Sequence, residues 1–240
     1  MTTPTLPLAF AHADLHTSVG WKSQLEAAER LSRDGAAISG NVLFALYTSR
    51  RPSASGGVWD RAHAIQKFET ALRINDTQTL QSALPAAWDA MQTVKTEITF
   101  ARQYGLAVAK ADLNGDALEL AIKIGLLSPD YEAVALLHPQ SDPFLNALAR
   151  GVPQNIETTD PQKQAISAAF GTVRAPQSLG ALAEDDKIGE AILRAIAMMN
   201  AGIAGDTLLL TDTLAFFRSI GLEDVARRVG LQLLLLERQR

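Results

Sequence analysis

The sequence lacks cysteine, has few aromatic residues and carries no excess of basic residues. Without cysteine, the chain can form no disulfide, no thiolate nucleophile and no cysteine-bound zinc site. Aromatic residues make up 6% of the 240 residues, which limits base-stacking platforms and aromatic sugar clamps. The formal net charge is −4, so no basic surplus is present to neutralise a phosphate backbone. These features argue against nucleic acid as the main partner.

Long apolar runs and short catalytic motifs are also missing. Apolar stretches such as 233–236 are far shorter than the roughly 18 residues that a membrane span requires. The sequence contains no G-x-S-x-G elbow and no S-x-x-K pair, and neither of the two glycine-rich phosphate-binding motifs. We therefore expect a soluble protein without a membrane span, assign it no catalytic residue and no cofactor, and favour a protein that is not an enzyme.

Alanine and leucine dominate the apolar residues, which make up 47% of the chain. Both lose little entropy in a helix, whereas sheets favour β-branched and aromatic side chains. Apolar residues recur three or four positions apart, which is the helical period, and no segment alternates apolar and polar residues as a strand does. Three proline pairs predict helix starts because a capping side chain precedes a proline at the first helical position. They are Ser128-Pro129, Asp142-Pro143 and Asp160-Pro161.

Three short turns, at Asn75-Asp76, Gly115-Asp116 and Gly205-Asp206, each end one predicted helix and cap the next. Their separations of 40 residues (75 to 115) and 90 residues (115 to 205) are about one and two helical-hairpin units. We predict an all-α fold, an irregular, solenoid-like and TPR-like array of αα-hairpins, with a compact multi-helix bundle as the alternative. The prediction is a single domain over 1–240; a subdivision into 1–150 and 160–240, with a loop at 151–159, is the other arrangement.

Two segments resemble metal-binding motifs. Asp112 to Asp116 reads D-x-N-x-D, which opens a calcium loop, but Lys123 occupies the position where the loop requires a bidentate acid. Asp116 is better explained as a helix N-cap. His12 and His16 would share a helix face, as zinc ligands do, yet the sequence suggests no third ligand. We assign no metal site.

A glycine-rich loop before a predicted helix at residue 58 offers the best candidate for ligand binding. Loop amides and an arginine would converge at the positive end of that helix and attract an anion. The alternative is structural: Asp60 complements the helix dipole and Trp59 packs as an anchor. If a small ligand binds, the candidate residues are Arg50, Arg51, Ser53, Ser55, Trp59 and Arg61.

Five stretches of the sequence carry a family resemblance: 43–47, 51–61, 124–129, 189–195 and 221–226. They resemble a helical family of alphaproteobacteria whose members often carry the label "antifreeze glycopeptide". The label does not fit the sequence, which has neither Ala-Ala-Thr repeats nor threonines in register. The resemblance covers most of the chain, brings no catalytic residue with it, and implies a longer exported parent, which favours the periplasm or cell envelope over the cytoplasm.

The pattern of paired helices without a catalytic motif favours a non-enzymatic interaction or scaffold module that binds a protein or peptide partner. The final predicted helix, 222–238, is apolar on nearly every face near its end, so it is either buried or available for self-association. The alternative function is a cell-envelope enzyme or carbohydrate-binding domain, acting on peptidoglycan through acidic residues that only the fold brings together.

Overall fold

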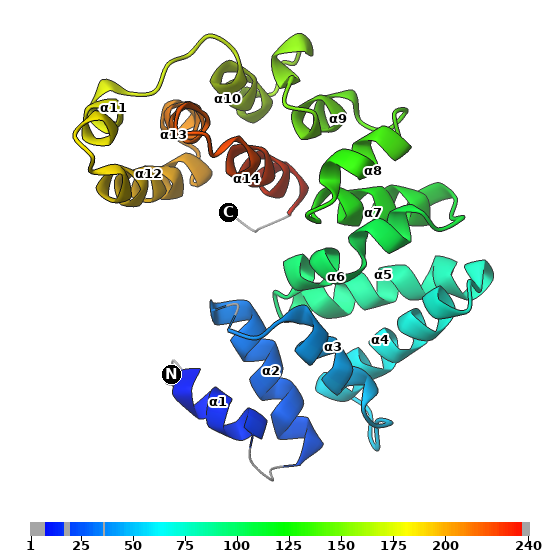
Figure 1. The fold of residues 1–240 in the computed structure, drawn as a ribbon. Coiled ribbons are helices and arrows are strands. Elements are labelled where there is room, and N and C mark those ends of the chain that lie inside the picture. Colours follow the sequence, from blue (N-terminus) through cyan, green and yellow to red (C-terminus); the bar gives the residue numbers. More distant parts are fainter. Residues whose placement is uncertain (1–7, 17–19, 36, 237–240) are drawn as a thin grey trace. The chain divides into compact units, whose positions relative to one another are not determined.

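The computed structural model describes residues 8–16, 20–35 and 37–236. It divides into two compact units, unit 1 (Met1–Asp130) and unit 2 (Tyr131–Arg240). All regular structure within those ranges is helical, and no strand occurs in them (Figure 1). The all-α prediction is therefore confirmed. None of the described helices is long and apolar enough to cross a membrane.

Unit 1 is a succession of helices in which most neighbours along the chain pack together. Helix α1 packs on α2, α4 on α5, and α6 on α7, while α3 also contacts α6 and α5 also contacts α7. This order is compatible with an irregular array of hairpins or with a bundle. The helices are α1 (Leu8–His16), α2 (Trp21–Gly35), α3 (Gly40–Thr48), α4 (Val58–Arg73), α5 (Thr77–Thr93), α6 (Glu97–Ala109) and α7 (Gly115–Leu126).

Unit 2 follows the same rule with shorter elements at its start. Helix α11 packs on α12, α12 on α13, and α13 on both α10 and α14 (Figure 1). Its elements are α8 (Tyr131–Leu137), α9 (Pro143–Ala149), the 3₁₀ helix η1 (Pro153–Asn155), α10 (Pro161–Phe170), α11 (Gln177–Glu184), α12 (Ile188–Ile203), α13 (Thr207–Ser219) and α14 (Glu223–Leu235).

Aspartate side chains begin several helices, as the sequence indicates. Asp142, Asp160 and Asp206 each accept hydrogen bonds from two backbone amides of the following helix, and Asp76 accepts one from the Thr79 amide. These bonds satisfy amides that have no partner inside the helix. The prediction that Asp116 is the N-cap of α7 is wrong. Asn114 occupies that position, and Asp116 lies in the first turn of the helix.

Other predicted boundaries also differ from the structure. The segment 151–159, which is the loop of the alternative subdivision, lies inside unit 2, where it contains η1 and the buried Pro153. Helix α8 begins at Tyr131, two residues after Pro129. Helix α11 begins directly after Pro176, although no helix start is predicted there from the sequence.

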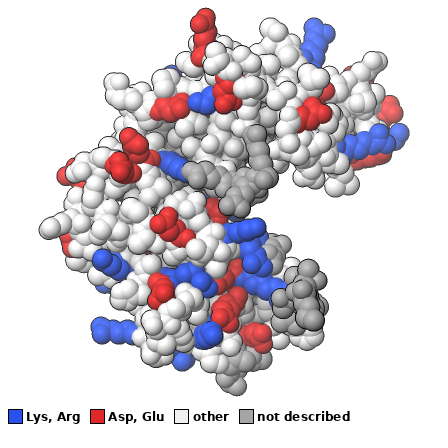
Figure 2. All heavy atoms as spheres, turned by 180° about the vertical axis from the view of Figure 1, so that it is seen from behind, with Lys and Arg blue, Asp and Glu red and all other residues white. Residues whose placement is uncertain are grey.

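Acidic and basic side chains are interspersed on the surface. On the face drawn in Figure 2, neither sign gathers into a large patch. Several of the exposed pairs lie four residues apart on one helix, such as Lys22 with Glu26 and Arg194 with Glu190. Pairs of this kind stabilise a helix only slightly.

Candidate functional site

A buried ion pair lies where the sequence suggested a ligand site. Arg61 on α4 donates from Nε and Nη2 to the two carboxylate oxygens of Glu29 on α2, over 2.7 and 2.6 Å. Tyr47 on α3 donates its hydroxyl to the same carboxylate over 2.5 Å. Burial, followed by the charge of Glu29, raises the pKa of Tyr47 well above its ordinary value. The cluster joins three helices. The guanidinium of Arg61, which an anionic ligand would require, is already bonded to Glu29.

The other candidate residues of this region lie around the loop before α4. Trp59 packs against Trp21, with ring centroids 5.2 Å apart, in agreement with the anchoring alternative. Asp60 accepts a hydrogen bond from the Gly56 amide, which closes the loop. The four remaining side chains are exposed and no described contact gathers them around a common centre. They are Arg50, Arg51, Ser53 and Ser55. Ligand binding by these residues stays a prediction.

The two histidines of α1 share a face, as their spacing predicts. The rings of His12 and His16 stack with centroids 5.6 Å apart. In the described ranges, no group of three or more histidine, cysteine, aspartate or glutamate side chains is placed to hold a metal ion. This histidine pair therefore has no third protein ligand among the described residues.

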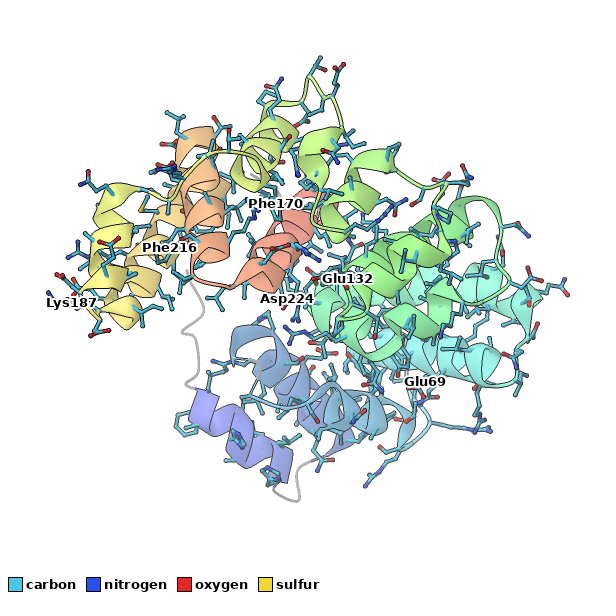
Figure 3. All side chains as sticks on the ribbon, turned by 45° about the horizontal axis from the view of Figure 1, so that its top comes forward. Glu69, Glu132, Phe170, Lys187, Phe216 and Asp224 are labelled. Carbon is cyan, nitrogen blue, oxygen red and sulfur yellow. The ribbon has the colours of Figure 1, made fainter. Side chains whose placement is uncertain are left out.

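Three carboxylates gather between α8 and α14 in unit 2. Figure 3 labels two of them, Glu132 on α8 and Asp224 on α14. Arg227 pairs with both Glu132 and Glu223, and Asp224 accepts a hydrogen bond from Tyr131 over 2.9 Å. Cations and a hydroxyl thus already engage the carboxylates, and their contacts link the start of unit 2 to its last helix. The alternative prediction of an acidic site that acts on peptidoglycan stays a prediction.

The end of α14 is mostly enclosed within unit 2. Leu231 is fully buried, and Leu235 and Leu236 are each 9% exposed. The small Gly230 allows this helix to approach Leu148, whose methyl carbon would lie 3.0 Å from an added Cβ. Burial therefore accounts for most of the apolar run near the C-terminus. Self-association through this helix stays a prediction.

Helix α12, by contrast, carries apolar side chains on its solvent face as well as on its buried face. Leu193, Ile196 and Ile203 are 69, 49 and 41% exposed. Together with the exposed Asn200, they follow a 3-4-3 spacing, which places all four on one side of the helix. We call these four residues the α12 outer face. The residues that turn inward are mostly small: Ala191, Ala195, Met199 and Gly202.

The inward side of α12 explains why its larger residues point outward. A Cβ added to Gly202 would lie 2.9 Å from the backbone nitrogen of Leu210 on α13. Such a close approach between two helices leaves room only for small side chains. The sequence predicts a helix here, but the spacing of its apolar residues does not reveal which side is buried, because two sides of the helix are apolar.

No protein-family model matches the chain, and no curated protein or solved structure matches it either.

Proposed function

We propose that this protein is a non-enzymatic interaction module and that its α12 outer face binds a helix of a partner protein. The observation that carries the proposal is the exposure of Leu193, Ile196 and Ile203 on one uncharged side of a helix. The charged residues of this helix, Glu190 and Arg194, pair with each other and lie outside this face. Exposed apolar patches of this kind often mark sites of protein interaction.

The spacing of the outer face favours a helical partner. Residues three and four positions apart meet a facing helix side by side, as the a and d residues of a coiled coil do. Asn200 occupies one of these positions, and a polar residue there fixes the register of the pair. The neighbouring Ala197 is small and exposed, so a partner helix can approach closely. The expected partner segment is amphipathic, with apolar residues at the same spacing and one hydrogen-bonding residue opposite Asn200.

The size of the face favours such a segment over a second copy of this chain. A stable protein pair uses roughly 20–30 residues on each side. The outer face lies within the stretch 193–203 of a single helix. A short helical segment can be covered by this surface, whereas two globular chains held by it alone would dissociate readily.

Photo-crosslinking tests the proposal directly. A benzoylphenylalanine placed at Ala197 in the full chain and irradiated in cells is expected to cross-link a protein whose attached peptide is amphipathic and helical. The matched control places the same group at Leu136, which is 68% exposed on α8, and is expected to give no such product. A synthetic peptide of the attached sequence then provides the affinity measurement.

The Leu193→Glu variant is expected to weaken binding of that peptide at least tenfold, because a charge would be buried against apolar residues. The Leu136→Glu variant, with nearly the same original exposure, should bind it as the unaltered protein does. Equal affinity of both variants would overturn the proposal. A dimer of the unaltered chain that Leu193→Glu dissociates would also contradict it, because the occupant would then be a second copy.

A further inference from the structure

Unit 2 contains a cavity of about 730 Å³ between helix α11, the segment that precedes it, and the end of α13. This volume lies within the range of small-molecule binding sites. Much of the wall is apolar and includes Val173, Ala215 and Ile220. Two arginines, Arg174 and Arg218, also line it.

Two contacts from α10 hold Arg218 in place. Its Nη1 donates to the backbone oxygen of Ala169 over 2.6 Å, and its guanidinium carbon lies 4.8 Å from the centre of the Phe170 ring. Its Nε is buried without a hydrogen-bond partner. A guanidinium has five N–H donors, so most of the hydrogen-bonding capacity of Arg218 is unused by described groups.

Among the described residues, the two cavity arginines lack the carboxylate partner that other arginines of the molecule have. Arg61 and Arg227 are engaged by carboxylates, whereas no described carboxylate pairs with Arg174 or Arg218. Arg218 is partly buried, and leaving a partly buried guanidinium without an anion is unfavourable. A ligand that supplies an anionic group would remove this cost.

The charge of the wall indicates which anion fits. Glu184 also lines the cavity, so the two arginines leave a net charge of +1 on the wall. That charge matches a single carboxylate rather than a polyphosphate, which would be repelled by Glu184. The first residue of α11, Gln177, belongs to the wall as well, and no side chain caps this helix start, which adds to the positive potential.

We propose that this cavity binds a monocarboxylate with an apolar body, whose carboxylate pairs with Arg174 and Arg218 while its body contacts the apolar wall. The same chemistry describes a free medium-chain carboxylic acid and the C-terminus of an apolar peptide. The proposal does not rest on partner binding by α12, because none of the α12 outer-face residues lines the cavity.

Calorimetric titration of the full chain with octanoate tests the proposal, with octan-1-ol as the uncharged counterpart. The second pair of probes is the acetylated tripeptide Ala-Leu-Val with a free C-terminus and the same peptide amidated. Binding of octanoate alone identifies a free acid as the ligand type, and tighter binding of the free-carboxylate peptide identifies a peptide C-terminus. Failure of both carboxylates to bind, or equal binding of a carboxylate and its uncharged counterpart, would overturn the proposal.

Three variants locate the binding. Arg174→Gln and Arg218→Gln are each expected to weaken carboxylate binding about tenfold or more, because a charge-assisted hydrogen bond is lost. Arg218 also holds the end of α10, so Arg174, which is exposed, provides the variant least able to affect folding. Gly180→Phe fills the cavity, since a Cβ at Gly180 meets no atom within 4 Å.

Gly189→Phe is the matched control for the cavity-filling variant. Gly189 also lies in a helix, a Cβ there meets no atom within 4 Å, and it does not line the cavity. We expect Gly180→Phe to abolish carboxylate binding and Gly189→Phe to leave it unchanged. Undiminished binding by Gly180→Phe would contradict the assignment of the site.

Discussion

The two units use their apolar residues differently. In unit 1, aromatic rings from several helices meet in the interior, and Phe100 contacts Phe44, Phe68, Trp88 and Tyr104 with centroids 5.0 to 6.1 Å apart. In unit 2, the described contacts between two aromatic rings comprise only the neighbours Phe216 and Phe217. The other buried rings of this unit make no described contact with another ring: Tyr131, Phe144 and Phe170.

The difference extends to the surface. Thirteen large apolar side chains are exposed among the described residues, and nine of them belong to unit 2. Aromatic rings in unit 1 fill large volumes from few positions. Helices of unit 2 that approach through alanine and glycine direct their larger residues outward. The comparison indicates that unit 1 gathers its rings in one buried cluster, whereas unit 2 leaves more of its large apolar side chains exposed to solvent.

The largest expected effect is the loss of Phe100. Its side chain is fully buried, so Phe100→Ala should lower the free energy of unfolding by about 3–5 kcal/mol. All three tryptophans lie in unit 1, so tryptophan fluorescence during urea unfolding reports on that unit. The matched variant in unit 2, Phe216→Ala, should shift far-UV circular dichroism but not the fluorescence transition. A shared shift in both signals would show that the units unfold together.

The next effect concerns the ion pair of Glu29 with Arg61. The Glu29 side chain is 7% exposed and that of Arg61 is 17% exposed, so Arg61→Met leaves a nearly buried carboxylate without its cation. We expect a loss of about 3 kcal/mol, part of which Glu29→Gln should restore in the double variant. The exposed pair on α12 provides the control, and Arg194→Met should cost less than about 0.5 kcal/mol. Equal losses in the two urea titrations would contradict the distinction between the pairs.

A smaller effect tests the close helix contact in unit 2. Gly202→Ala places a methyl group against the backbone of Leu210, and we expect a loss of about 1–3 kcal/mol from overpacking. The change should appear in circular dichroism and leave the tryptophan signal unaltered. At Gly189, where an added Cβ has open space, the same substitution should stabilise the protein by up to about 1 kcal/mol because alanine favours the helix.

The smallest effect near pH 10 comes from the tyrosines. Burial and a neighbouring carboxylate raise the pKa of Tyr47 and of Tyr104 in unit 1, and burial, with a hydrogen bond to Asp224, raises the pKa of Tyr131 in unit 2 to about 12. The folded state therefore retains phenol protons that the unfolded chain loses near pH 10. Stability is complete below that pH and falls as pH rises further.

Unit 1 contains two such tyrosines and unit 2 contains one. We therefore expect the stability of unit 1 to fall more steeply with pH above pH 10 than the stability of unit 2. Urea midpoints are measured from pH 9 to 11.5 for each unit. The midpoint of unit 1, followed by tryptophan fluorescence, should fall more steeply with pH than the midpoint of unit 2, which only circular dichroism detects. Tyr131→Phe should flatten only the unit 2 slope. Identical slopes in the two signals would indicate that the units do not respond separately.

Local patterns were sufficient for much of the fold. The helical period and the capping aspartates Asp142, Asp160 and Asp206 correctly predicted helices, because both act over one or two turns. Helix α11 was not predicted, because its interior contains Gly180, a residue with a low preference for helix. The candidate site was harder to predict. Trp59 was correctly weighed as an anchor, but Arg61 meets Glu29 from 32 positions away, and no local pattern signals such a partner.

The sequence by itself determined that this chain is helical, because the preference for helix and the capping of helix ends are local properties of consecutive residues. Only the tertiary structure decided which apolar side of α12 is buried, since that choice depends on how closely α13 can approach Gly202. The same holds for Arg174 and Arg218, which lie 44 positions apart (174 to 218) yet line one cavity. Contacts over such separations are set by packing between helices, which the order of residues in any one segment does not encode.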